Sequence, residues 1–192
     1  MSAQIVRLQS IDKKLGLLDE GLNRLNVGGL LELYCIIPSD ISSFPTYNFS
    51  FDSTKEAKAS GDIDLLADSE VYVFRFTPAT GGFTEKMSED IDGVYYEQLL
   101  SISIPKDHPA LTWIKQTMRR RRFLFIYRDS NGLIKLLNKQ NEGARVKFDL
   151  QIGNKSTDFN HTSISILRNS RTPAIFWDIP LQDNIIDHIN IL

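Results

Sequence analysis

Four consecutive arginines, Arg119, Arg120, Arg121 and Arg122, form the densest run of like charge in the chain. Guanidinium groups bind phosphate and carboxylate oxygens through paired hydrogen bonds, so the run can serve as a contact for phosphate or for an acidic partner. The run also ends a segment with helical spacing, and positive charge is favoured at a helix C-terminus. Both interpretations stay open at this stage, although four adjacent charges exceed what a helix end needs.

The three histidines lack the neighbours that a metal site requires. His108, His161 and His188 have no second histidine or cysteine at zinc-ligand spacing. An acidic run at residues 62–70 has Ala67 where an EF-hand calcium loop needs glycine, and Val73 where it needs glutamate. This run and a second one at residues 85–92 are therefore interpreted as solvated surface, and we expect no metal.

Nucleophile and phosphate-loop motifs are also missing from the sequence. Cys35 is the only cysteine and lies within an apolar run, where a buried structural thiol is the expected role. The pairs Gly28–Gly29 and Gly81–Gly82 lack the Lys-Ser/Thr of a phosphate loop. We expect no catalytic residue and no cofactor. Two carboxylates brought together by the fold would be the remaining route to acid–base catalysis.

The composition is that of an ordinary globular protein. The chain has 192 residues, 42% of them hydrophobic and 24% charged, and a formal net charge of -2. Proteins that bind nucleic acid are usually basic, so this balance disfavours that role. The sequence shows no signal peptide and no apolar run near the ~18 residues of a membrane span, which predicts a soluble protein made in the cytoplasm.

The elements that must position these residues are mostly strands. Alternating and β-branched segments, bounded by proline, glycine and asparagine, predict about nine or ten strands. Asn131-Gly132 between two apolar runs predicts a tight hairpin. One amphipathic helix is predicted over Pro109–Arg120, with proline near its first position. The predicted strands span residues 30–37, 47–51, 71–77, 83–87, 94–104, 123–128, 133–137, 146–152, 161–167 and 174–177.

Two connecting segments carry predictions of their own. Lys55–Gly61 is polar and is expected to be exposed. The turn residues Thr80-Gly81-Gly82 would let the strand at 83–87 pair back on the strand at 71–77.

These elements predict a mainly β fold, an antiparallel β-sandwich or barrel with one flanking α-helix. Residues 30–180 would form this domain, preceded by a partly helical N-terminal arm at 1–29 and followed by a C-terminal arm at 181–192. Apolar residues in both arms would either dock on neighbouring subunits or pack against their own domain.

The second half of the chain carries a family resemblance. A strand ends in Ile104-Pro105-Lys106, and the helix after it contains Trp113-Ile114. The predicted hairpin follows, from Phe125 to Leu137. After the hairpin come Gly143, an alternating strand that ends at Gly153, Asn160 at the start of another strand, and Pro173-Ala174-Ile175-Phe176. Over residues 70–178 this order resembles small tail-tube, tail-terminator or neck proteins in virions of tailed phages and prophages of Bacteroidetes-type bacteria. Leu137 is followed by Asn138, where a glycine is common in that pattern.

The resemblance implies a tail-tube-like fold that assembles into a ring. Such rings are often sixfold and surround a channel that DNA crosses in passing. The partners would be the chain itself, as a hexamer, and other virion proteins, with no membrane involved. The location would be the virion, after synthesis in the host bacterial cytoplasm. A mild negative charge is compatible with a wall along which DNA slides.

Two functions from different classes follow. The first is a structural virion protein that assembles into a ring or tube of a phage tail or neck through edge strands and arms. The alternative is a non-catalytic β-sandwich module that binds a ligand such as a glycan on exposed aromatic side chains. The candidate aromatic residues for that alternative are Tyr95, Tyr96, Trp113 and Trp177.

Overall fold

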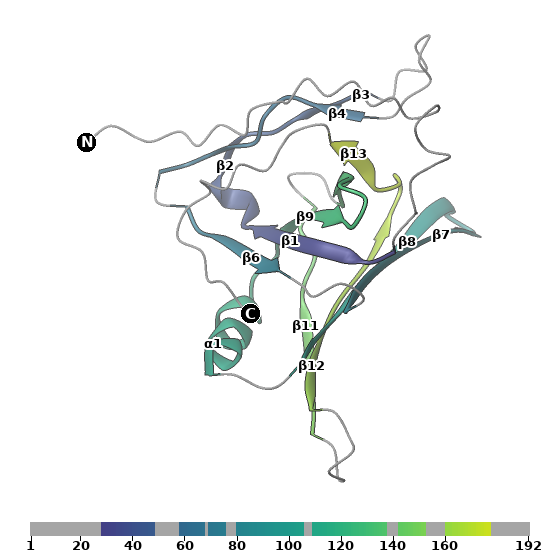
Figure 1. Ribbon diagram of the computed structural model, residues 1–192. Helices are drawn as coiled ribbons and strands as arrows, with labels where there is room; N and C mark the ends of the chain where they lie inside the picture. The colour runs from purple at the N-terminus through teal and green to yellow at the C-terminus, as the bar shows by residue number, and fades with distance from the viewer. Residues whose placement is uncertain are drawn as a thin grey trace.

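The protein is described here from a computed structural model, in which two sheets, a small strand pair and a helix account for most of the described chain (Figure 1). The structure describes residues 28–48, 58–67, 69–75, 80–105, 109–137, 142–152 and 160–177. The predicted N-terminal and C-terminal arms lie almost wholly outside these residues. The described strands are β1 (Leu30–Ile36), β2 (Ile41–Ser43), β3 (Thr46–Asn48), β4 (Lys58–Ser60), β5 (Asp64–Leu65), β6 (Val71–Arg75), β7 (Gly81–Asp90), β8 (Gly93–Pro105), β9 (Leu124–Asp129), β10 (Ile134–Leu136), β11 (Lys147–Gln151), β12 (His161–Ser170) and β13 (Ile175–Trp177).

The strands form two main sheets that face each other. The larger sheet has the order β3-β4-β13-β10-β9-β1-β6, and the smaller sheet has the order β11-β12-β8-β7. Every described pairing is antiparallel except that of β13 with β4. Neither sheet closes on itself, so the fold is sandwich-like and is not a closed barrel. The predicted mainly β antiparallel fold with a flanking helix is confirmed.

The main core lies between the two sheets, because alternate residues of each strand point inward. Leu33 and Cys35 of β1 face this layer, as do Leu100 and Ile102 of β8, and all four are buried. The helix α1 (Pro109–Met118) closes one side of the layer with three side chains that are fully buried, Leu111, Ile114 and Met118. The spacing of three and four along the helix places them on one stripe, as the sequence predicted.

A second apolar layer covers the opposite face of the larger sheet. Tyr34 and Ile36 of β1 lie in it, together with Ile63 and Leu65 from the segment that contains the β2–β5 pair. Trp177 is buried in the same layer and donates its indole N–H to the carbonyl oxygen of Gly61 at 3.1 Å. The central strands are therefore buried on both faces, which explains the nearly continuous apolar sequence of β1 and β9.

The structure corrects local predictions in two segments. In Lys55–Gly61, predicted to be exposed, residues 55–57 lie outside the described residues and Gly61 is exposed, but Ala59 in β4 is buried opposite Trp177. The strand β7 pairs with β8 and does not pair with β6. Gly81 was expected in a turn, yet it begins β7. A Cβ at Gly81 would stand 3.3 Å from the Cβ of Leu30, so glycine permits this close approach to β1.

The β9–β10 hairpin agrees with the sequence. Gly132 has a φ of 82°, the left-handed conformation that glycine adopts without strain. The Asp129 carboxylate accepts hydrogen bonds from the backbone N–H groups of Asn131 and Leu133, at 2.9 and 2.8 Å. These bonds fix the turn, and the register that follows pairs β10 with β9.

Candidate assembly surface

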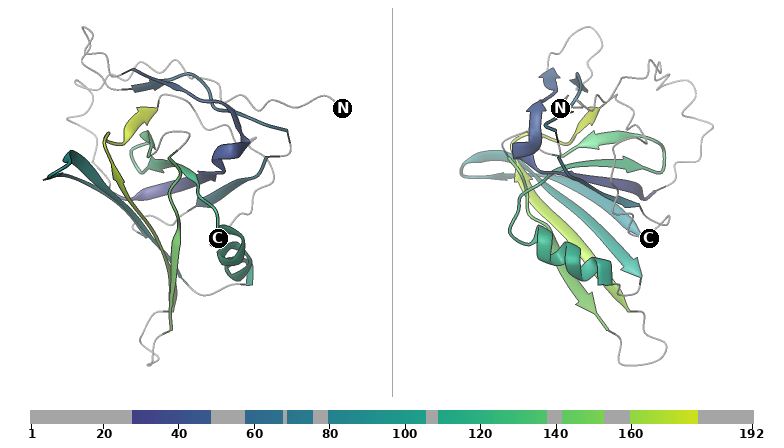
Figure 2. Two further views of the ribbon diagram at one scale, coloured as in Figure 1. Left: turned by 180° about the vertical axis from the view of Figure 1, so that it is seen from behind. Right: turned by 90° about the vertical axis from the view of Figure 1, so that its left-hand side faces the viewer.

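The β7–β8 hairpin is longer than the sheet that carries it. Its strands pair without a register shift from Gly81 opposite Ile102 to Asp90 opposite Gly93. The neighbouring strand β12 pairs with β8 only as far as Ser170 opposite Tyr96. Residues 88–95, here called the hairpin tip, therefore continue as a two-stranded ribbon beyond β12, and Figure 2 shows this ribbon projecting from the body.

The base of the hairpin is held to the sandwich by a polar cluster. The Glu85 carboxylate accepts hydrogen bonds from the Gln98 side chain at 2.8 Å and from the backbone N–H of Ala174 at 2.7 Å. Phe83, two residue pairs closer to the core along the β7–β8 ladder, packs on Tyr127 with ring centroids 4.9 Å apart. Burial raises the pKa of Tyr127 well above its ordinary value, with a smaller contribution from nearby carboxylates. The tip thus projects from a rigidly attached base.

The outer edge of β7 has no strand partner among the described residues. The backbone N–H of Ser103 donates to the carbonyl oxygen of Thr80 at 2.8 Å, which sets the alternation of hydrogen-bonded positions along the hairpin. By that alternation, the odd-numbered residues from Gly81 to Glu89 direct their backbone groups to the free edge. β7 contains neither proline nor a bulge, so nothing in its backbone blocks pairing with another strand.

The outer face of the smaller sheet is rich in hydroxyl groups. Ser101 lies opposite Ser165, and Ser103 lies opposite Ser163, on the face that points away from the buried Ile102 and Ile164. An exposed leucine pair, Leu99 and Leu167, adjoins the serines. This face can contact a passing polymer without strong electrostatic attraction, because uncharged side chains occupy its centre.

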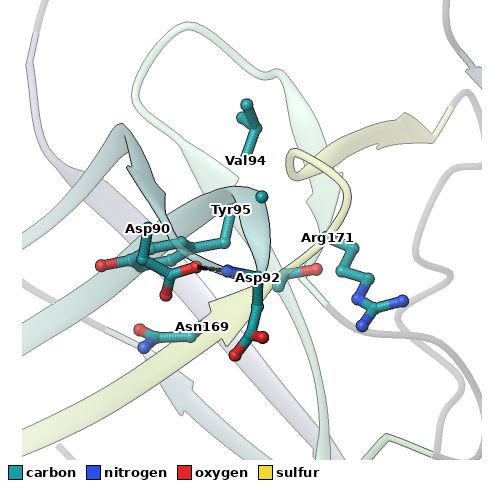
Figure 3. Close-up of a pocket in the computed structure, with 8 residues that line it drawn as sticks. Asp90, Asp92, Val94, Tyr95, Asn169 and Arg171 are labelled. Atoms are coloured by element: carbon teal, nitrogen blue, oxygen red, sulfur yellow. Dashed lines mark hydrogen bonds between the residues drawn. The ribbon is translucent and has the colours of Figure 1, made fainter.

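A shallow open hollow of about 210 Å³ lies beside the hairpin tip (Figure 3). It is lined by Asp90, Asp92 and Tyr95 from the hairpin and by Asn169 and Arg171 from the end of β12 and the following turn. The Asp90 carboxylate accepts a hydrogen bond from the backbone N–H of Asp92 at 2.9 Å, which fixes the turn. In Figure 3 the Arg171 guanidinium points away from the Asp90 carboxylate, so these two groups do not form an ion pair.

The four arginines lie at the other side of the molecule, between α1 and β9, and all four are exposed. An isolated bridge pairs Phe123 with Ala144, and this antiparallel contact sets Arg122 opposite the exposed Arg145. We call Arg119–Arg122 with Arg145 the arginine cluster. Arg122 donates to the Gly143 carbonyl oxygen at 3.2 Å. Within the described part of the chain, none of the five forms an ion pair.

A separate charged row joins three strands of the larger sheet. Glu32 of β1 lies opposite Arg75 of β6 and Arg128 of β9. Its carboxylate is 3.3 Å from Arg75 Nε and 3.1 Å from Arg128 Nη2, and it accepts a hydrogen bond from the Tyr34 hydroxyl at 2.8 Å. Burial, and secondly this hydrogen bond, raise the pKa of Tyr34 well above its usual range. Glu32 is the one buried carboxylate among the described residues, so they contain no buried pair of acids.

The aromatic residues proposed for ligand binding do not gather on one face. Tyr95 and Tyr96 are consecutive in β8 and therefore point to opposite faces of the sheet. Trp113 is half exposed on α1, whereas Trp177 is buried in the second apolar layer. The structure thus distributes the four candidates over four separate places.

The histidines, the acidic run at 85–92 and Cys35, all candidates for chemistry in the sequence, do not form a common site among the described residues. His161 is half-buried at the start of β12, and His108 and His188 lie outside the described residues. The acids at 85–92 are mostly exposed, as expected, and Cys35 is fully buried, which raises the pKa of its thiol well above the ordinary value. The described residues contain no cluster of three or more histidine, cysteine or acidic side chains suited to a metal ion. None of their helices is long and apolar enough to span a membrane.

Comparison with known proteins returned no match: no family model, no curated protein and no solved structure is similar to this chain. The hairpin tip, the free edge of β7 and the arginine cluster are therefore interpreted from their own geometry. Of these three features, the arginine run was visible in the sequence. The exposed residues Met87, Ile91 and Val94 around a predicted turn were the signal that could have indicated the tip.

Proposed function

We propose that this chain is a structural protein that assembles with copies of itself into a ring or tube, as a component of a phage tail or neck. The observation that carries the proposal is the smaller sheet, whose outer strands β7 and β11 both have a free edge among the described residues. A strand with unpaired backbone groups is a ready template for a strand of another chain.

The strand directions favour repeated edge-to-edge pairing. Three antiparallel ladders separate β11 from β7, so the two edge strands run in opposite directions within one copy. In a ring generated by rotation, each β11 keeps its direction relative to the axis. The β7 of one copy would then meet the β11 of the next as an antiparallel pair, and the sheets would join into one continuous wall.

The outer face of the smaller sheet suits the inner wall of such a ring. Its centre consists of the paired serines Ser101–Ser165 and Ser103–Ser163, which carry no charge. DNA would slide along a wall of this kind because the serines carry no charge and the exposed Lys147 and Asp149 beside them on β11 carry opposite charges. The assignment to a phage tail or neck rests on the resemblance in residues 70–178, and the strand–helix–hairpin order of that resemblance is the order of β8, α1, β9 and β10.

Light scattering on the full chain during size-exclusion chromatography tests the proposal. We expect a discrete particle whose mass is a multiple of 21.9 kDa, formed either alone or on addition of other tail or neck proteins, and visible as rings by electron microscopy. A strict monomer at high concentration, with no assembly in the presence of such partners, would contradict the proposed function.

A further inference from the structure

The hairpin tip combines negative charge with exposed apolar surface. Glu89, Asp90 and Asp92 lie in it, and residues 88–95 contain no lysine, arginine or histidine. Ile91 at the turn is fully exposed, and Val94 beside it is 49% exposed. A large apolar side chain held at the end of a projecting ribbon gains free energy when a partner covers it. A partner that complements the acids must be positively charged.

The arginine cluster is the complementary surface that this chain offers. Its five guanidinium groups are exposed and have no ion-pair partner among the described residues. The helix dipole accounts for only part of the charge, because α1 ends at Met118 and the dipole effect fades within the last turn. Arg121, Arg122 and Arg145 lie beyond its reach. Neighbouring like charges repel one another, and a bound acidic partner relieves that repulsion.

The two surfaces cannot meet within one copy. In Figures 1 and 2 the free end of the β7–β8 hairpin and α1 lie on opposite sides of the sandwich. A contact between different surfaces on opposite sides of a molecule is heterologous, so it can repeat from copy to copy. We propose that the hairpin tip of one copy docks on the arginine cluster of another copy. This inference rests on the proposed function and adds a second contact to the same assembly.

Charge reversal on each surface tests the contact. The tip variant is Glu89→Lys/Asp92→Lys, which spares Asp90 because its carboxylate fixes the turn. The cluster variant is Arg121→Glu/Arg145→Glu, which changes two exposed arginines beyond the reach of the helix dipole and spares Arg122 because it bonds to Gly143. Each full-length variant is examined alone and mixed with the other, by sedimentation velocity at about 50 and about 500 mM NaCl.

We expect the dissociation constant of the assembly to rise at least about tenfold above the wild-type value for each variant by itself. The equimolar mixture of the two variants should recover association. Recovery is expected because both contacts in the mixture join opposite charges. The lysine tip of the tip variant meets the glutamates of the cluster variant, and the acidic tip of the cluster variant meets the arginine cluster of the tip variant. Asp62→Lys, which makes the same charge change as Asp92→Lys at a distant site, should leave association unchanged. Circular dichroism and the unfolding midpoint establish that every variant is folded.

Three results would overturn the contact. If both variants form rings of wild-type mass, the proposed function stands and the tip does not dock on the cluster. If the cluster variant loses association and binding to labelled duplex DNA while the tip variant associates like the wild type, the arginine cluster is a site for polyanions. A wild-type chain that stays monomeric at both salt concentrations, alone and with its candidate partners, refutes the contact and the proposed function together.

Discussion

Replacing Glu32 by glutamine removes the one negative charge from the row that joins β6, β1 and β9. The carboxylate contacts Arg75 at 3.3 Å and Arg128 at 3.1 Å, and it accepts a hydrogen bond from Tyr34 at 2.8 Å. Glutamine has nearly the same shape, so the substitution isolates the effect of charge. The substitution leaves the guanidinium groups of Arg75 and Arg128 without the carboxylate that lies between them.

The size of the effect follows from how far each group is buried. Breaking a buried ion pair costs about 3–5 kcal/mol, whereas an exposed pair contributes about 0.2–1 kcal/mol. The Glu32 side chain is 11% exposed, while Arg75 and Arg128 are 44% and 41% exposed and can regain water. We therefore expect Glu32→Gln to lower the free energy of unfolding by about 2 kcal/mol, between those limits.

Urea unfolding followed by tryptophan fluorescence measures this change, because Trp177 is buried in the apolar layer next to the row. The matched control is Glu89→Gln, an exposed glutamate in β7, which should change the free energy of unfolding by less than about 0.5 kcal/mol. If Glu32→Gln costs no more than this control, the charged row does not join the strands and the reasoning is wrong.

Three further predictions concern other parts of the fold. Gly143→Ala should destabilise the protein by about 1–3 kcal/mol in urea unfolding, because the new Cβ would stand 2.9 Å from the Arg122 Cβ; an unchanged midpoint would contradict this close approach. Burial, and secondly the bond to Glu70, raise the pKa of Tyr72 to about 12 from 10.0, so its contribution to stability is complete below pH 10 and is lost as pH rises towards about 12. Tyrosinate absorbance in an alkaline titration should show this delayed ionisation, and a titration complete near pH 10 in the folded protein would argue against it. The Cys35 thiol is fully buried with a raised pKa, so thiol reagents should label it only at the rate of unfolding; rapid labelling of the folded chain would be inconsistent with the main core.

The sequence predicts elements well where local chemistry decides the structure. The β9–β10 hairpin follows from Asn131-Gly132, and the helix start follows from Pro109, because each residue type restricts the backbone by itself. The alternating strand β12 follows for a similar reason, since one of its faces is buried. The same prediction is wrong for β11, in which no residue is buried and Leu150 is 42% exposed. These predictions need no knowledge of distant contacts.

Features that depend on distant contacts could not be predicted. Ala59 looks exposed in a polar segment, but its burial is decided by Trp177, more than a hundred positions away in the chain. Gly81 has the local appearance of a turn residue, yet the approach of Leu30 places it in a strand. In both cases the tertiary neighbour overrides the local preference.

The candidate assembly surface is likewise only partly predictable from the sequence, because some of its features depend on distant contacts. The arginine run was visible in the sequence, whereas its extension by Arg145 depends on the bridge between Phe123 and Ala144. The sequence predicts that the acids of the hairpin tip are solvated surface, and they are exposed. The hairpin tip projects from the body because β12 stops pairing with β8 at Ser170 opposite Tyr96. The pattern of each strand by itself does not predict where the pairing of two distant strands ends.

Edge-to-edge pairing of β7 is the central claim, and Met87→Pro tests it most directly. The backbone N–H of Met87 points to the free edge by the hairpin alternation, so proline there leaves the β8 ladder intact and removes a donor that a neighbouring copy would use. Lys86→Pro is the matched control, because it removes a bond to β8 and should unfold the hairpin. Sedimentation velocity should show a discrete assembly for the wild type and a folded 21.9 kDa monomer for Met87→Pro. An assembly of the same mass in both proteins would contradict the account.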